Sequence, residues 1–175
     1  MNRNRKVVSL VLGVALLIVN PVFSQQAATN SQDVVPQDMP FDVPYGTAIS
    51  LERSQAAVNA AVAEAKKRGW KMNVAVVDSG GNLVAFQRMD GAMLASIQVA
   101  EHKARAAATF RRETKVFESA IQANNLSVLT LDGVIASRGG IPLIEQGKLI
   151  GAIGCSGGVG SQDELVCKAG AGVLR

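Results

Sequence analysis

The feature that most constrains the fold is a pair of short apolar runs separated by a Gly-rich turn. The run VAVV at residues 74–77 leads into DSGGN at 78–82, and LVAF at 83–86 follows. Two β-forming runs around a short Gly-containing connection predict a β-hairpin. A second Gly-rich block, at residues 139–164, has the same character. Together the two blocks predict a domain built on an antiparallel sheet.

Helical signals lie on both sides of the hairpin. Apolar periodicity and capping residues predict helices at residues 50–68, 93–110 and 114–123. Ser50 and Thr114 are the expected N-caps, and Gly69 is expected to end the first helix. The buried face of the second helix is predicted to carry Met93, Ile97, Ala100, Ala104 and Ala107. A capping box of the S-x-x-E type, Ser161 to Glu164, predicts where the last helix begins.

The remaining strands are predicted in the second Gly-rich block. One lies near residues 142–144, where Pro142 indicates an edge strand. The next covers residues 148–155, where Gly151 and Gly154 indicate a bulge or a close approach of another backbone. The predicted fold class is therefore α+β, with an antiparallel sheet of about five strands and flanking helices.

The first 24 residues are interpreted as a secretory signal peptide. Arg3, Arg5 and Lys6 precede an uncharged run at residues 7–19, and Ser24 ends a segment suited to cleavage. An uncleaved membrane anchor is the alternative, but the run is shorter than the roughly 20 residues that a spanning helix needs. We therefore expect a periplasmic or secreted protein without stable membrane insertion after cleavage.

Removal of the signal peptide would lower the net positive charge of the chain. Of the 18 Lys and Arg residues three leave with the signal, which leaves 15 against 14 Asp and Glu and a net charge of +1. Such a balance does not support nucleic-acid binding. Residues 25–49 hold three prolines without apolar periodicity and are interpreted as an extended arm, of which 39–45 is the more apolar part. The folded domain is expected at residues 50–175.

The chain has two cysteines, Cys155 and Cys167, and both follow the signal segment. Cys155 is expected at the end of a strand and Cys167 about two turns into the following helix. They are either two buried thiols or a disulfide. We favour the disulfide, because two cysteines close in the sequence of an exported protein seldom stay free.

Taken together, several motifs resemble the GlcG/HbpS family of small haem-binding-type proteins. The matching segments are residues 73–92, the spacing of Ser96, Ala100, Lys103 and Ala104, Thr114, and then 139–143, 150–158 and 162–164. The resemblance covers most of residues 50–175. It implies a profilin-like α+β fold, assembly into homo-oligomers and, for exported members, a link to haem. Other members occur beside metabolic genes and have no settled biochemical role.

Haem needs an axial ligand and cationic groups near its propionates. His102 is the only histidine, with Arg105 one turn further along the predicted helix. Thr114 lies where the family carries a Thr, beside Arg111 and Arg112, whose forked donors would suit propionates. These five residues form the candidate cofactor site. Structural roles are the alternative: His102 as a solvated surface residue, Thr114 as a helix N-cap, and Arg111 and Arg112 as a solvated helix end.

Other chemistries find little support in the sequence. No C-x-x-C-H motif for covalent haem, no G-x-S-x-G elbow and no metal-ligand cluster of standard spacing occurs. Asp78 is expected to bond its own turn. Two functions remain: an exported haem-binding protein that sequesters, senses or slowly degrades haem, and a small oligomeric enzyme or accessory protein acting on a small metabolite in periplasmic oxidation.

Overall fold

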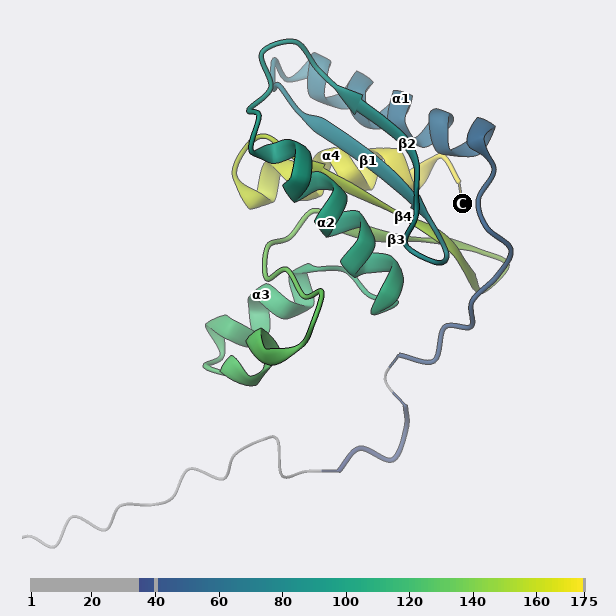
Figure 1. Cartoon of the computed structure of the whole chain (residues 1–175), viewed down its shortest axis with the longest axis vertical. Coiled ribbons are helices and arrows are strands. Elements are labelled where there is room, and N and C mark those ends of the chain that lie inside the picture. The colour runs from purple at the N-terminus through teal and green to yellow at the C-terminus, as the bar shows by residue number, and fades with distance from the viewer. Residues whose placement is uncertain (1–34, 40, 175) are drawn as a thin grey trace, which may run out of the picture. The chain divides into compact units, whose positions relative to one another are not determined.

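The fold is an α+β arrangement of four helices, one 3-10 helix and four strands among residues 35–39 and 41–174, which the computed structural model describes. In chain order the elements are α1 (Leu51–Lys67), β1 (Asn73–Asp78), β2 (Leu83–Arg88), α2 (Ser96–Thr109), α3 (Lys115–Gln122), η2 (Leu126–Thr130), β3 (Gly140–Glu145), β4 (Lys148–Ser156) and α4 (Gly160–Gly172) (Figure 1).

The sheet is antiparallel throughout, with the strand order β2-β1-β4-β3. The predicted fold class is confirmed, but the predicted count of about five strands is wrong for the described residues. Residues 126–130 form the 3-10 helix η2, and the arm contributes a single bridge, between Tyr45 and Leu149. Pro44 has no N–H to extend that pairing. β3 lies at the edge of the sheet, as the proline at position 142 predicts.

The predicted hairpin is present, and β1 pairs with β2 from Asn73 opposite Arg88. Its turn is organised by Asp78, whose Oδ1 accepts the N–H groups of Gly80 and Asn82 at 2.8 and 2.9 Å. Partial burial alone would raise the pKa of Asp78, but hydrogen bonds from the turn hold this pKa below its ordinary value. Asp78 thus bonds its own backbone, as expected.

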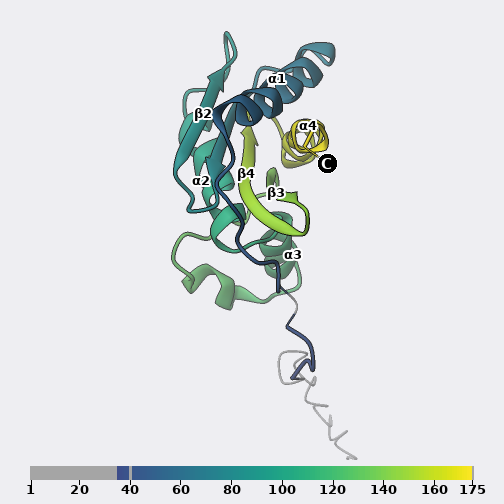
Figure 2. The same cartoon turned by 90° about the vertical axis from the view of Figure 1, so that its right-hand side faces the viewer.

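Helices cover both faces of the sheet (Figure 2). α1 and α4 pack on one face over Val74, Val76 and Ile153, and α2 packs on the other over Ala75 and Ala152. Alternate residues of β1 therefore point to opposite helices, as the two-residue period of a strand requires.

Close contact between α2 and β4 depends on Gly154. A Cβ atom at this position would lie 2.1 Å from the carbonyl oxygen of Ala100, so only glycine fits. The close approach predicted there is confirmed. Ala100, Ala104 and Ala107 are buried as predicted, whereas Met93 is 60% exposed because α2 begins only at Ser96.

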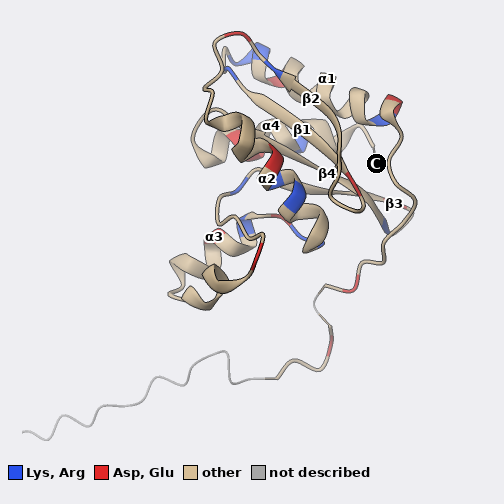
Figure 3. Ribbon diagram, viewed as in Figure 1, with Lys and Arg blue, Asp and Glu red and all other residues tan. Residues whose placement is uncertain are grey.

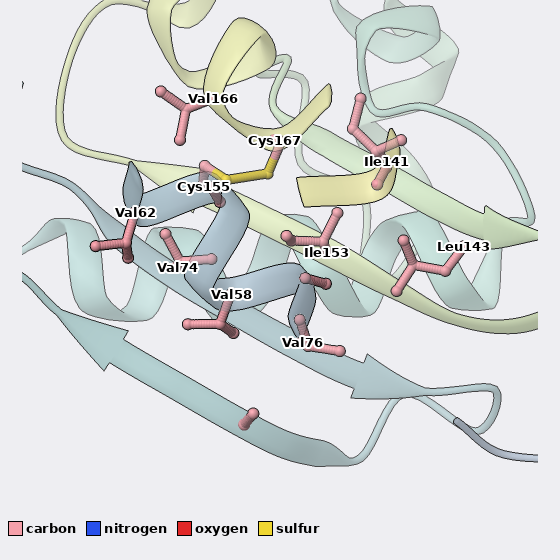
Figure 4. Packing of buried hydrophobic residues seen from close by; sticks show 14 of the residues in the cluster. Val58, Val62, Val74, Val76, Ile141, Leu143, Ile153, Cys155, Val166 and Cys167 are labelled. Carbon is pink, nitrogen blue, oxygen red and sulfur yellow. A yellow bond between two sulfur atoms is a disulfide. The ribbon is translucent and has the colours of Figure 1, made fainter. Parts of the chain in front are cut away.

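Cys155 and Cys167 form a disulfide that joins β4 to α4, with their Cα atoms 5.6 Å apart (Figure 4). Both residues are fully buried in the cluster between the sheet and the two helices. Of the two states considered for the cysteines, the structure has the disulfide.

The start of α4 differs from the prediction. The helix begins at Gly160, and the side chain of Gln162 accepts the N–H of Val159 at 3.0 Å. The predicted Ser161–Glu164 capping box is wrong, because Asp163 and Glu164 are buried and bond cationic side chains instead. By contrast, the predicted cap of α1 is confirmed: Ser50 Oγ accepts the N–H of Arg53 at 3.3 Å.

The predicted signal peptide, residues 1–24, lies outside the described residues. Residues 39–175 form one compact unit, and the arm belongs to it from Met39 onward. Gly46 and Ile49 donate backbone hydrogen bonds to Leu149 and Ile150, so the end of the arm lies along β4. Among the described residues, no helix is long and apolar enough to cross a bilayer.

Candidate functional site

The chain's one histidine lies in a groove on the solvent side of α2. The groove has a volume of about 360 Å³ and is lined by Gln98, Glu101, His102, Arg105 and Gly133. Four of these residues are three or four positions apart on α2, so they share one face of the helix. The loop that follows η2 supplies the fifth lining residue, Gly133. The sequence predicted that Arg105 would lie one helical turn beyond His102, and both residues line this groove.

His102 is held by a backbone contact from that loop. Its Nε2 lies 3.1 Å from the carbonyl oxygen of Gly133. A carbonyl oxygen only accepts, so Nε2 carries the proton in this contact, and in the neutral ring the lone pair then lies on Nδ1. Histidine ligands of metals are commonly oriented in this way, by donating the other ring N–H to a backbone carbonyl.

Arg105 also lines the groove. Its Nε donates to the carbonyl oxygen of Gly81 at 3.3 Å, so the hairpin turn contacts α2 here. Glu101 adds a negative charge to the same face, and the basic residues Lys103 and Arg105 follow it along α2, where the ribbon changes from red to blue (Figure 3). The groove therefore offers one imidazole and one guanidinium next to a carboxylate.

Thr114 does not point into this groove. Thr114 is fully buried. Its Oγ1 accepts a hydrogen bond from the N–H of Gly140 at 2.9 Å, and its own N–H donates to the carbonyl oxygen of Gly140 at 3.0 Å. Thr114 occupies the N-cap position of α3, but its side chain makes no capping bond, so the predicted capping role is wrong. The hydroxyl instead ties α3 to β3.

The structure directs Arg111 and Arg112 toward the N-terminal arm. Arg111 donates from Nη1 to the carbonyl oxygen of Val43 at 3.0 Å, and the guanidinium of Arg112 lies 3.2 Å from the ring centre of Phe41. Of the five predicted site residues, the groove thus brings together His102 and Arg105. Arg111, Arg112 and Thr114 are engaged elsewhere.

Sequence reasoning assigned no role to the ion pair of Lys103 and Asp163. The Lys103 Nζ lies 2.8 Å from Asp163 Oδ2 and 3.3 Å from the carbonyl oxygen of Cys155. Burial raises the pKa of Asp163, and the ammonium of Lys103 opposes that rise. One signal was available: Lys103 falls among the alanines of the buried face of α2, where a cation needs a partner.

A second group of charged residues joins α3 to α4. Arg138 contacts Glu118, with Nη2 2.6 Å from Oε1, and reaches Glu164 at 3.3 Å. Glu164 also bonds Lys115 and Lys168. The hydrogen bond from Arg138 is the main reason that the pKa of Glu118 lies below its ordinary value.

The match to a protein-family model decides the family. The model described as "Haem degrading protein HbpS-like" matches residues 49–172. The chain belongs to the HbpS-like family. This confirms the resemblance noted from the sequence motifs. Among curated proteins, GlcG of Escherichia coli K12 is 38% identical over 108 residues, which make up 62% of this chain and 81% of GlcG.

Solved structures of the family share the fold. A crystal structure of HbpS superimposes with a TM-score of 0.69 at 31% identity, covering 85% of this chain and 99% of HbpS. A complex of PduOC with haem gives a TM-score of 0.67 at 27% identity, covering 74% of this chain and 96% of PduOC. The family thus includes members that bind haem.

Proposed function

We propose that this protein binds haem at the α2 groove, with His102 as the axial ligand. The observation that carries the proposal is the contact between His102 Nε2 and Gly133, which fixes the ring and leaves Nδ1 free for iron. Membership of a family in which PduOC forms a haem complex supports the choice of ligand. When bound, haem would supply its iron and porphyrin chemistry.

Arg105 is the residue placed to pair with a propionate, one helical turn from His102. On haem binding, Arg105 would give up its hydrogen bond to Gly81 and donate to the propionate carboxylate instead. Glu101 opposes anionic groups nearby, and at about 360 Å³ the groove lies at the small end of ligand pockets. These features support partly exposed, exchangeable haem, which suits sequestration or sensing.

A haemin titration followed in the Soret region tests the proposal. We expect a saturable shift that His102→Ala abolishes and Arg105→Ala weakens. Arg68→Ala, which removes the arginine at the C-cap of α1 and outside the groove lining, is the control and should leave binding unchanged. If His102→Ala binds haemin with an unchanged shift, the assignment of His102 as the ligand is wrong even though haem binds. Without a saturable shift, action on a small metabolite becomes the better proposal.

We also propose that the protein is exported to the periplasm or secreted. The N-terminal sequence pattern and the buried Cys155–Cys167 disulfide support this, because disulfides persist in oxidising compartments. Mass spectrometry of protein from the native host should find a mature N-terminus at or near Gln25. Intact Met1 on a cytoplasmic protein would contradict it.

Self-association into a homo-oligomer is proposed as well. Exposed apolar side chains gather on α3 and around η2, where Val116, Leu126, Leu129 and Leu131 are accessible to solvent. Such a concentration of apolar side chains is typical of association surfaces. Light scattering should give a mass several times that of one chain, and a monomer at micromolar concentration would speak against it.

A further inference from the structure

Two adjacent arginines at the end of α2 lack a carboxylate partner among the described residues. No ion pair there includes Arg111 or Arg112. Their hydrogen bonds go to backbone carbonyls, from Arg111 Nη1 to Val43 and from Arg112 Nε to Phe110, each at 3.0 Å. A guanidinium has five N–H donors, so most of the donors of this pair have no protein acceptor among residues 35–39 and 41–174.

Aromatic rings cover the two guanidinium groups. Arg112 lies 3.2 Å from the ring centre of Phe41 and 5.6 Å from that of Phe117, and Arg111 lies 5.4 Å from that of Tyr45. Phe41 and Tyr45 belong to the arm, whereas Phe117 belongs to α3. The arm therefore supplies planar groups to arginines whose geometry suits both ring stacking and forked carboxylate binding.

The backbone conformation that holds this pair is strained. Arg111 has a φ of 55°, in the left-handed region that a residue with a Cβ adopts at a cost in free energy. The chain turns sharply here, and the N–H of Arg112 bonds the carbonyl of Ala107 at 3.3 Å. Burial and the charge of Arg111 lower the pKa of Arg112, in keeping with two uncompensated cations side by side.

We propose that Arg111 and Arg112 form a binding site for a planar aromatic carboxylate, and that residues 41–45 of the arm occupy this site as an intramolecular competitor. Phe41 holds the position that the ligand's ring takes on Arg112. The ligand's carboxylate accepts from the unused guanidinium donors, which the arm leaves without an anion. Binding at this site releases the arm. The site is separate from the His102 groove and does not rest on haem binding.

Calorimetric titration of the purified protein with 2-naphthoate tests this site, with the uncharged 2-naphthalenemethanol as the matched ligand. Phe41→Ser removes the competing ring. We expect this variant to bind naphthoate about five- to tenfold more tightly than the unaltered protein, the size of one cation–π contact. Arg68→Ala removes a separate arginine–aromatic contact, over Trp70, and should leave the affinity unchanged.

Two further variants, made in the Phe41→Ser background, test the arginines. Arg112→Gln should remove the gain in affinity. Arg111→Gly should reduce the gain in affinity. This substitution is not expected to disturb the fold, because glycine adopts a φ of 55° without strain. Equal binding by the unaltered protein and Phe41→Ser would overturn the arm's role. Equal binding of the two ligands, unchanged affinity in Arg112→Gln, or no binding of naphthoate by any variant would overturn the site.

Discussion

Lys103 and Asp163 form an ion pair that is almost closed to solvent, with Nζ 2.8 Å from Oδ2 and side chains 1% and 4% exposed. The pair links α2 to α4 through the end of the sheet, because Lys103 also bonds the carbonyl of Cys155 and Asp163 accepts the N–H of Gly158. Both charges therefore lose their hydration when the chain folds, and each depends on the other.

Replacing one member of this pair is expected to be far more costly than replacing both. Lys103→Met should lower the free energy of unfolding by about 3–5 kcal/mol, because it leaves the Asp163 carboxylate buried without its cation. The double variant Lys103→Met, Asp163→Leu should recover most of that loss. Urea unfolding of Lys103→Met, of Asp163→Leu and of the double variant measures how strongly the two side chains depend on each other. If the losses of the two single variants add up in the double variant, the expected coupling is absent.

Reducing the Cys155–Cys167 disulfide should lower stability without removing the fold. The bond closes a loop with a sequence separation of 12, for which the chain-entropy model gives about 3 kcal/mol. The paired variant Cys155→Ala, Cys167→Ala should show a similar loss in urea unfolding. The oxidised protein should weigh two hydrogens less than the reduced form. Two thiols that alkylate readily in native protein would refute the bond.

Gly154→Ala should destabilise the protein through backbone contact. The added Cβ would meet the Ala100 carbonyl at 2.1 Å and the Ala104 nitrogen at 2.5 Å, so α2 must move off β4. We expect a loss of about 1–3 kcal/mol in chemical unfolding. Gly172→Ala is the control: a Cβ there has no atom within 4 Å, so stability should stay equal or rise. Equal effects of the two substitutions would contradict this packing.

Acidification should weaken the attachment of α3. The pKa of Glu118 is lowered in the folded state, chiefly by Arg138, so the folded protein binds this proton less readily than the unfolded chain. The stabilisation is therefore present above the unfolded value of about 4.3 and is lost as pH falls from there through the folded pKa. Urea midpoints measured between pH 7 and pH 3 should fall less in Glu118→Gln than in the unaltered protein. If the urea midpoints of the two proteins fall in parallel with pH, groups other than Glu118 cause the acid sensitivity.

The hairpin, α1 and the edge position of β3 could be predicted because their signals are local. The DSGGN turn, the Ser50 cap and Pro142 each act within a few residues of themselves. The disulfide also followed from residues close in the sequence. The 3-10 helix η2 was missed, since residues 126–130 carry no strong periodic pattern.

The site was harder to predict because its contacts join distant segments. Helical spacing placed His102 beside Arg105, but Gly133, which lies 31 positions further along the chain, orients the imidazole. The partners of Arg111 and Arg112 come from an arm that precedes α1. Asp163 was expected at a helix start, and its burial against Lys103 depends on how α2 crosses β4. No short window of sequence contains such information.

The reciprocal hydrogen bonds of Thr114 and Gly140 join the two ends of the excursion through α3 and η2. Because these ends already meet, a longer tip at residues 124–131 would not move the exit of α2 away from β3. The entropic cost of closing the loop grows only slowly with its length. The tip can therefore change in length while β3 and α2 keep their places, although an insertion there would alter the apolar surface proposed for self-association.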